Sequence, residues 1–185
     1  MIAREQVVQI VKQCLEEGRT VEIDGLGLFR PGSGGKVAFV AGPQPRVFLA
    51  YACEDGSSAE RLFDQLQRCG FDPWLDRRKL LPGQNWPRAI EQAIGTSDFF
   101  VACFSKRSTA RRSNFHSELR YALDCARRLP LDGIYFIPVR LDNCMVPGQI
   151  ANQIQYVDLF PDWNKGFRRI VAAMRKEWRS RAPEK

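Results

Sequence analysis

The sequence has 185 residues and a net charge of +7, with 44% hydrophobic and 26% charged residues. This length suits one full domain plus a small appendage, and the composition is that of an ordinary soluble globular protein. The longest apolar runs are too short to span a bilayer, a signal-peptide pattern is missing, and one histidine without any Cys-x-x-Cys pair argues against a metal site.

The first 42 residues predict a helix followed by a β-hairpin. Residues 4–17 carry apolar side chains at helical spacing, and Gly18 ends this pattern. Residues 20–23 and 26–30 read as two strands around an Asp24-Gly25 turn, and residues 36–41 read as a third strand. Residues 43–45 contain two prolines, so they form a linker that cannot be helical.

This helix and hairpin resemble part of the histone-like HU/IHF family. The resemblance lies in Leu15-Glu16-Glu17-Gly18-Arg19-Thr20-Val21-Glu22-Ile23-Asp24-Gly25-Leu26-Gly27-Leu28-Phe29 and in Phe39-x-Ala41-Gly42. That family holds DNA with a long basic arm between these strands, and residues 31–36 leave no room for one. Residues 1–45 hold five basic and five acidic residues, so they would neutralise phosphates weakly. We therefore expect a dimerising or docking element rather than nucleic-acid binding; a DNA-sensing segment is the alternative.

Residues 46–181 alternate strand and helix patterns, which predicts an α/β domain. The expected strands are residues 46–50, 71–75, 98–104, 134–139 and 155–159. Their spacing indicates a flavodoxin-like five-stranded parallel sheet of order 2-1-3-4-5. Ser57 with Glu60 predicts a capping box at the start of the first helix of this domain.

Polar loops follow the strands of this sheet at one end. In the expected order, the first and third strands are neighbours, and residues 52–56 and 105–113 meet at the switch point between them. The long loop of residues 76–85, after the second strand, stands alongside. Ligands bind at this end of such sheets, so these loops are the candidate site.

Four blocks in residues 46–181 resemble the TIR (Toll/interleukin-1 receptor) domain family, in a bacterial form. They occur in family order: Val47-Phe48-Leu49-Ala50-Tyr51-Ala52-x-Glu54-Asp55, Gly70-Phe71-x-x-Trp74-Leu75-Asp76-x-x-x-Leu80-x-x-Gly83-x-x-Trp86, Ser97-Asp98-Phe99-Phe100-Val101-x-x-x-Ser105 and Phe115-x-x-Glu118-Leu119-x-x-Ala122-Leu123. The second block includes the family's BB loop, which corresponds to residues 76–85 here. Many members cleave NAD+ at the nicotinamide–ribose bond, or cyclise the product, and they are active on self-association through the BB loop.

The resemblance implies a cytoplasmic NAD+ hydrolase or cyclase in bacterial anti-phage immunity or signalling, with NAD+ as substrate and no further cofactor. Its catalytic residue would be Glu118, in the helix after the central strand. A single carboxylate suffices, because the cationic nicotinamide leaves as a neutral ring without a general acid. The residues expected to bind substrate are Tyr51, Ala52, Asp55, Asp76, Trp86, Ser105, Arg111 and Phe115. Arg77, Arg111 and Arg112 are open alternatives for the diphosphate.

Two departures from the family favour a second hypothesis. Asn114 stands where the family usually has an aromatic residue four positions before the glutamate, and Ala52-Cys53 stands where some active members carry arginine. The alternative is therefore a non-catalytic adaptor that assembles with other TIR domains. Several site residues also have plain structural readings, with Tyr51 and Phe115 as core or wall aromatics and Trp86 as a helix anchor.

Overall fold

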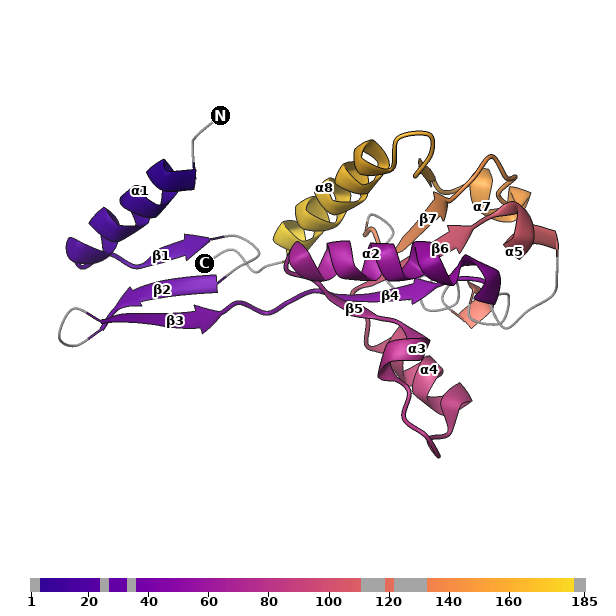
Figure 1. Ribbon diagram of the computed structural model, residues 1–185, viewed down its shortest axis with the longest axis horizontal. Helices are drawn as coiled ribbons and strands as arrows, with labels where there is room; N and C mark the ends of the chain where they lie inside the picture. Colours follow the sequence, from indigo (N-terminus) through magenta and orange to yellow (C-terminus); the bar gives the residue numbers. More distant parts are fainter. Residues whose placement is uncertain (1–3, 24–26, 33–35, 111–118, 122–132, 182–185) are drawn as a thin grey trace. The chain divides into compact units, whose positions relative to one another are not determined.

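The computed structural model describes residues 4–23, 27–32, 36–110, 119–121 and 133–181. The chain divides into two compact units, Met1–Gln44 and Pro45–Lys185. We call them the N-terminal unit and the C-terminal unit. Figure 1 shows the helices and strands of both.

The N-terminal unit is one helix and a three-stranded antiparallel sheet, as the sequence predicts. Its elements are α1 (Arg4–Glu16), β1 (Val21–Ile23), β2 (Gly27–Pro31) and β3 (Val37–Ala41), with the strands in the order β1-β2-β3. The helix ends where Gly18 adopts a φ of 78°, a conformation that side chains with a Cβ resist. The Arg19 N–H then donates to the Cys14 carbonyl at 2.8 Å and closes the helix end.

A five-stranded parallel sheet forms the centre of the C-terminal unit. Its strands are β4 (Arg46–Ala50), β5 (Asp72–Trp74), β6 (Phe99–Phe104), β7 (Phe136–Arg140) and β8 (Val157–Asp158). They lie in the order β5-β4-β6-β7-β8, and every neighbouring pair is parallel. This is the predicted order 2-1-3-4-5. All six residues of β6 are buried, as befits the central strand.

Helices cover both faces of this sheet (Figure 1). The described helices of the C-terminal unit are α2 (Gly56–Arg68), α3 (Asp76–Lys79), α4 (Trp86–Gly95), α5 (Lys106–Ala110), α7 (Gly148–Ala151) and α8 (Trp163–Arg181), together with the 3₁₀ turn η2 (Cys53–Asp55). Helices α2 and α8 bury their apolar stripes in one core cluster, and α4 buries Ile90 and Ile94 in the other.

Aromatic rings stack across four neighbouring strands on the face that α4 covers. Trp74, Phe48, Phe100 and Phe136 follow one another with ring centroids 4.7, 5.2 and 5.4 Å apart. Such cross-strand pairs add stabilisation beyond their buried area. They fix the register of the strands whose ends carry the polar loops.

The structure differs from the sequence expectation at the start of α2. The helix begins at Gly56, directly after η2, and the residue that precedes it, Asp55, caps no helical N–H with its side chain. The predicted capping box of Ser57 and Glu60 is therefore wrong. The physical reason is that the chain passes directly from η2 into α2, so Ser57 is the second residue of the helix and cannot be its N-cap.

Two segments predicted as loops contain short helices. Residues 76–79 form α3 and residues 106–110 form α5. The helix predicted after the central strand falls mostly outside the described residues. Leu119–Tyr121 are helical there, and Leu119 is buried, as its place in the apolar stripe requires.

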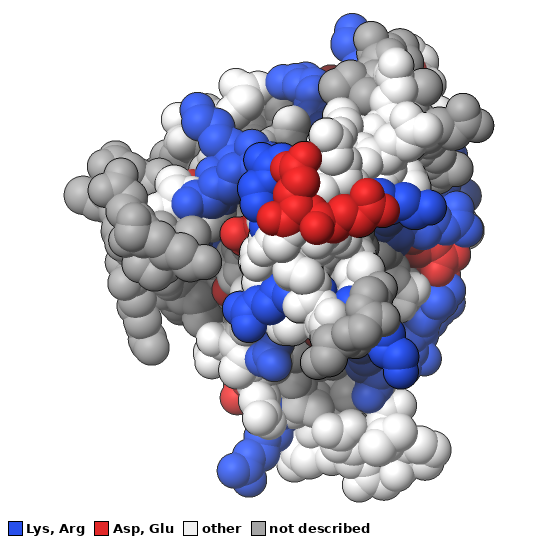
Figure 2. Space-filling model, turned by 90° about the vertical axis from the view of Figure 1, so that its left-hand side faces the viewer, with Lys and Arg blue, Asp and Glu red and all other residues white. Residues whose placement is uncertain are grey.

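The surface of the described residues gives two further findings. None of their helices is both long and apolar enough to cross a membrane. Figure 2 shows that both basic and acidic side chains are exposed on the described part of the chain.

Candidate functional site

The loops after β4 and β6 are joined by a buried hydrogen bond. Ser105 donates its hydroxyl to the Asp55 carboxylate at 2.6 Å, and both side chains are buried. The same Ser105 oxygen accepts from the backbone N–H groups of Arg107 and Ser108, at 3.1 and 3.0 Å. Ser105 thereby caps α5 and holds the first loop against the third strand.

Burial raises the pKa of Asp55 above its ordinary value. The Ser105 hydrogen bond and the nearby Arg107 charge oppose this, because both favour the carboxylate. Arg107 also reaches the Glu54 carbonyl at 3.4 Å. Asp55 is therefore a buried carboxyl group whose charge depends on its two neighbours.

A second cluster links the loop after β4 to the BB loop. The Tyr51 hydroxyl donates to Asp76 at 2.6 Å, and the Arg77 N–H donates to the same carboxylate oxygen at 2.7 Å. The Arg77 guanidinium contacts the Cys53 carbonyl oxygen at 3.3 Å and the Cys53 sulfur at 3.0 Å. Burial and the Asp76 carboxylate raise the pKa of Tyr51. Tyr51 is thus a neutral phenol near pH 7, and its proton is donated to Asp76.

Five of the predicted site residues come together at the carboxyl ends of three neighbouring strands. Tyr51, Ala52 and Asp55 follow β4, Asp76 follows β5, and Ser105 follows β6. Glu118, Arg111 and Phe115 lie outside the described residues, so the structure leaves their roles as predictions.

Trp86 differs from its expected packing. It begins α4 and is 49% exposed, whereas Ile90 and Ile94 of the same predicted stripe are buried. The Asn85 side chain accepts from the Arg88 N–H at 3.2 Å and caps this helix. The helix start is therefore fixed by Asn85 and not by the Trp86 ring.

Sequence reasoning missed three residues of this site: Arg107, Ser108 and Asp142. Asp142 follows β7 and accepts the Lys106 N–H at 3.1 Å, which ties a fourth strand end to α5. Its position just after a predicted strand was a usable signal. The roles of Arg107 and Ser108 depend on α5, which the sequence pattern did not reveal.

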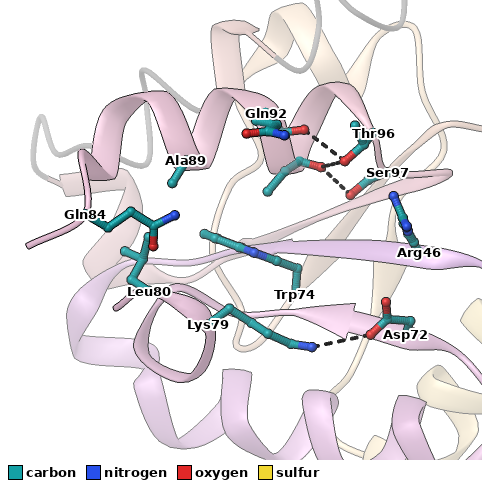
Figure 3. A pocket seen from close by; sticks show the side chains of 11 residues that line it. Arg46, Asp72, Trp74, Lys79, Leu80, Gln84, Ala89, Gln92, Thr96 and Ser97 are labelled. Carbon is teal, nitrogen blue, oxygen red and sulfur yellow. Dashed lines mark hydrogen bonds and ion pairs between the residues drawn. The ribbon is translucent and has the colours of Figure 1, made fainter. Parts of the chain in front are cut away.

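A pocket of about 270 Å³ lies elsewhere, along the sheet edge formed by β5 (Figure 3). Its walls come from β5, the end of α3, the BB loop and α4, with Trp74 between Gln84 and Arg46 in the close-up. The complete lining is Arg46, Asp72, Trp74, Lys79, Leu80, Gln84, Ala89, Gln92, Ala93, Thr96 and Ser97. It contains none of the predicted site residues, so within the described residues this pocket and the loop site are separate.

The described side chains of the loop site indicate which ligand chemistry it can offer. Within the described ranges, groups of three or more His, Cys, Asp or Glu that could hold a metal ion are absent. The described cysteines, Cys14, Cys53, Cys69, Cys103 and Cys144, are free thiols. What the loops offer is a neutral phenol, buried carboxyl and hydroxyl groups, and two guanidinium groups, which together suit a polar, anionic ligand.

A family model described as "TIR domain" matches residues 47–171. The chain belongs to the TIR domain family. Among solved structures it is similar to the TIR domain of the Toll-related receptor TRR-2 from Hydra magnipapillata, with a TM-score of 0.57 and 23% identity, over 70% of this chain and 97% of that one.

Other similar structures are larger assemblies. A metazoan TIR-STING receptor from C. gigas in complex with 2',3'-cGAMP matches with a TM-score of 0.57 and 22% identity, over 69% of this chain and 38% of that one. The TIR domains of the activated Roq1 resistosome, which directly recognises the pathogen effector XopQ, match with a TM-score of 0.55 and 20% identity, over 73% and 99%. At these identities the likeness shows the fold.

A curated relative, "Uncharacterized protein y4cD" of Sinorhizobium fredii (strain NBRC 101917 / NGR234), is 22% identical over 116 residues. The match covers 63% of this chain and 18% of the relative, so the chain spans less than a fifth of that protein's length.

Proposed function

We propose that this TIR domain cleaves NAD+ at the nicotinamide–ribose bond, as a hydrolase or cyclase, with Glu118 as the catalytic residue. Membership of the TIR family carries the proposal, because that family includes enzymes of this class. The polar residues gathered at the carboxyl ends of β4, β5 and β6 support it. A cytoplasmic role in bacterial immunity or signalling belongs to the same proposal, and the resistosome and receptor contexts of the similar structures agree with it.

Cleavage of the nicotinamide–ribose bond mainly requires the protein to place charged and polar groups correctly around the substrate. The nicotinamide of NAD+ leaves as a neutral ring, so Glu118 acts by holding the ribose hydroxyls and stabilising the positive charge that develops on the sugar. The Tyr51 hydroxyl donates its proton to Asp76, so toward a ribose hydroxyl its oxygen acts as a hydrogen-bond acceptor at the strand end. Arg77 and Arg107, which flank the first loop on its two sides, bind the diphosphate.

Arg77 also supplies a positive charge at a position where some active relatives carry arginine and this chain does not. Ala52-Cys53 replaces arginine in this loop, yet the Arg77 guanidinium contacts the carbonyl oxygen and sulfur of Cys53. A positive charge is therefore present at the loop, although another segment of the chain supplies it. This contact favours the catalytic reading over the adaptor reading.

Incubation of concentrated protein with NAD+ tests the proposal. We expect nicotinamide release by the wild type and a loss of about 100-fold or more in Glu118→Ala, since the charge at the reacting sugar would lose its partner. Glu91→Ala, which removes an exposed glutamate from α4, is the matched control and should keep full activity. Equal release by the wild type and Glu118→Ala would exclude the assigned role.

One observation favours the adaptor as a second candidate. Leu81, inside the BB loop, and Trp86, directly after it, are 72% and 49% exposed, and exposed apolar side chains of this size are available for a protein–protein contact. These exposed apolar side chains are equally compatible with self-association of an active enzyme. Binding of a second TIR domain with no NAD+ consumption at high protein concentration would select the adaptor.

A further inference from the structure

The N-terminal unit has too small a core for its size. Among its described residues, Leu15 is the only large apolar side chain that is buried. Val7, Val8 and Ile10 of α1 and Val37, Phe39 and Val40 of β3 are instead 44–54% exposed. A unit of 44 residues is at the size where folding usually needs a disulfide, a metal or a second chain. Its single cysteine, Cys14, is a free thiol, so a disulfide within the unit is excluded.

The two edges of its sheet differ sharply. One edge, β1, is three residues long and carries the exposed Glu22. The other edge, β3, reads Val-Ala-Phe-Val-Ala, with neither a charge nor a proline. Natural edge strands are usually protected by such residues or kept short, because their unpaired backbone groups bind other strands. The edge of β3 has none of these protections.

The backbone register shows which groups β3 presents outward. Gly32 donates its N–H to the Lys36 carbonyl at 2.7 Å, so these two residues form a hydrogen-bonded pair of the β2–β3 ladder. In an antiparallel ladder such pairs alternate with non-bonded pairs. Pro31, which has no N–H, then falls opposite Val37 at a non-bonded pair, as it must. The N–H and C=O groups of Val37, Phe39 and Ala41 therefore point away from β2, to the open edge.

We propose that the N-terminal units of two copies of this chain pair through β3, edge to edge and antiparallel. A two-fold axis at Phe39 aligns the outward groups of Val37 and Phe39 with those of the second copy's Ala41 and Phe39. Each of these pairs exchanges two backbone hydrogen bonds, and the two sheets become one. Because the surface is self-complementary, the pair closes as a symmetric dimer and does not propagate.

The charges of this segment fit a second copy. Residues 1–45 have five basic and five acidic residues, so two copies do not repel each other, whereas residues 46–185 have an excess of seven positive charges. In the proposed register Lys36 lies opposite the second copy's Gly42, and no like charges meet across the edge. The half-exposed valines and phenylalanine of β3 then gain apolar cross-strand neighbours on the other β3.

This dimer does not depend on NAD+ cleavage, but it deepens the proposed function. Joining two N-terminal units would tether two TIR domains, and the second TIR contact would then form at a high effective concentration. The assay for the dimer contains no NAD+. The absence of dimerisation would therefore contradict this inference alone, and the absence of NAD+ cleavage would contradict the proposed function alone.

Sedimentation of the full chain over a range of concentrations tests the proposal. We expect the wild type to dimerise and Val37→Lys to raise the dimer dissociation constant by roughly tenfold or more. Val37 sits at a non-bonded pair with β2, so its replacement leaves the β2–β3 hydrogen bonds in place. Glu22→Lys adds a lysine to the opposite edge and should dimerise like the wild type. Equal far-UV circular dichroism would show that the variants remain folded.

Amide hydrogen exchange of the wild type supplies a second readout. In the dimer, the N–H groups of Val37 and Phe39 should be protected like those of Ala38 and Val40. In a monomer, only Ala38 and Val40 are protected. A wild type that stays monomeric, or a dimer that Val37→Lys leaves intact, would overturn the proposal; the latter would place the contact on the TIR domain.

Discussion

At the scale of single residues, Ser105 is the side chain on which the loop site depends most. Its oxygen donates to Asp55 and accepts from two backbone N–H groups, and its own N–H donates to the Ser108 hydroxyl at 2.8 Å. Each of these groups is buried or partly buried, so a lost partner leaves a polar atom without solvent. Removal of this one hydroxyl therefore disturbs both the Asp55 carboxylate and the start of α5.

Ser105→Ala should lower the free energy of unfolding by about 1–3 kcal/mol. The loss should grow with pH. Burial raises the pKa of Asp55 in the folded state, so the folded protein holds this proton more tightly than the unfolded chain, and stability falls as pH rises above about 4. Without the Ser105 hydroxyl that pKa rises further, so the fall continues to higher pH and its total is larger. Urea unfolding at about pH 3.5 and pH 7 measures the difference.

Asp55→Asn provides the control for this prediction. In that background residue 55 carries no charge at any pH, so the effect of Ser105→Ala should become independent of pH. A constant effect of Ser105→Ala in the Asp55 protein would show that the hydroxyl does not support the carboxylate.

At the scale of elements, the contact between α8 and β8 depends on a glycine. Gly166 lies in the first turns of α8, where a Cβ atom would approach the Asp158 carbonyl oxygen to 2.1 Å and the Leu159 side chain to 3.0 Å. The obstacle is backbone of the edge strand, which cannot rotate away. The absence of a side chain at this position therefore sets how closely the last helix packs on the sheet.

Gly166→Ala should lower the free energy of unfolding by about 3 kcal/mol, the upper end of the range for overpacked cores. Gly95→Ala is the matched control, because its Cβ would meet only the Tyr121 hydroxyl, at 3.8 Å. Alanine is the better helix former, so that change should be neutral or stabilising by up to about 1 kcal/mol. Chemical denaturation of both variants measures the contrast, and equal stability of the two would contradict the close packing.

The longer elements of this fold could be predicted from sequence, since each has its own periodicity. The apolar runs of the strands and the stripes of α2, α4 and α8 predicted the order of the parallel sheet and the helices that cover it. Helices α3 and α5 could not be predicted, because four or five residues are too few to show a helical period. The need for glycine at position 166 could not be predicted either. It arises from the close approach of α8 to the end of β8, which only the fold brings about.

The loop site shows the same division. The gathering of Tyr51, Asp55, Asp76 and Ser105 at one edge could be predicted, because residues that follow parallel strands meet there. Their role in binding substrate came from the family resemblance and stays a prediction. The sequence pointed to Ser57 and Glu60 as local partners for a helix start, whereas Asp55 finds its partner in Ser105, 50 residues away. Local motifs predict local hydrogen bonds, whereas the bond between Ser105 and Asp55 joins residues that only the fold brings together.

At the scale of the whole molecule, the two proposals together predict how activity depends on concentration. If TIR domains must associate to cleave NAD+, and the N-terminal units bring them together, the rate per chain should rise with concentration and level off where dimers are complete. Val37→Lys should shift this rise to roughly tenfold higher concentration and reach the same final rate, because it leaves the loop site unchanged. Nicotinamide release measured over a dilution series gives both curves. A rate per chain that is the same at all concentrations, or a Val37→Lys curve that overlays the wild type, would separate the N-terminal dimer from catalysis.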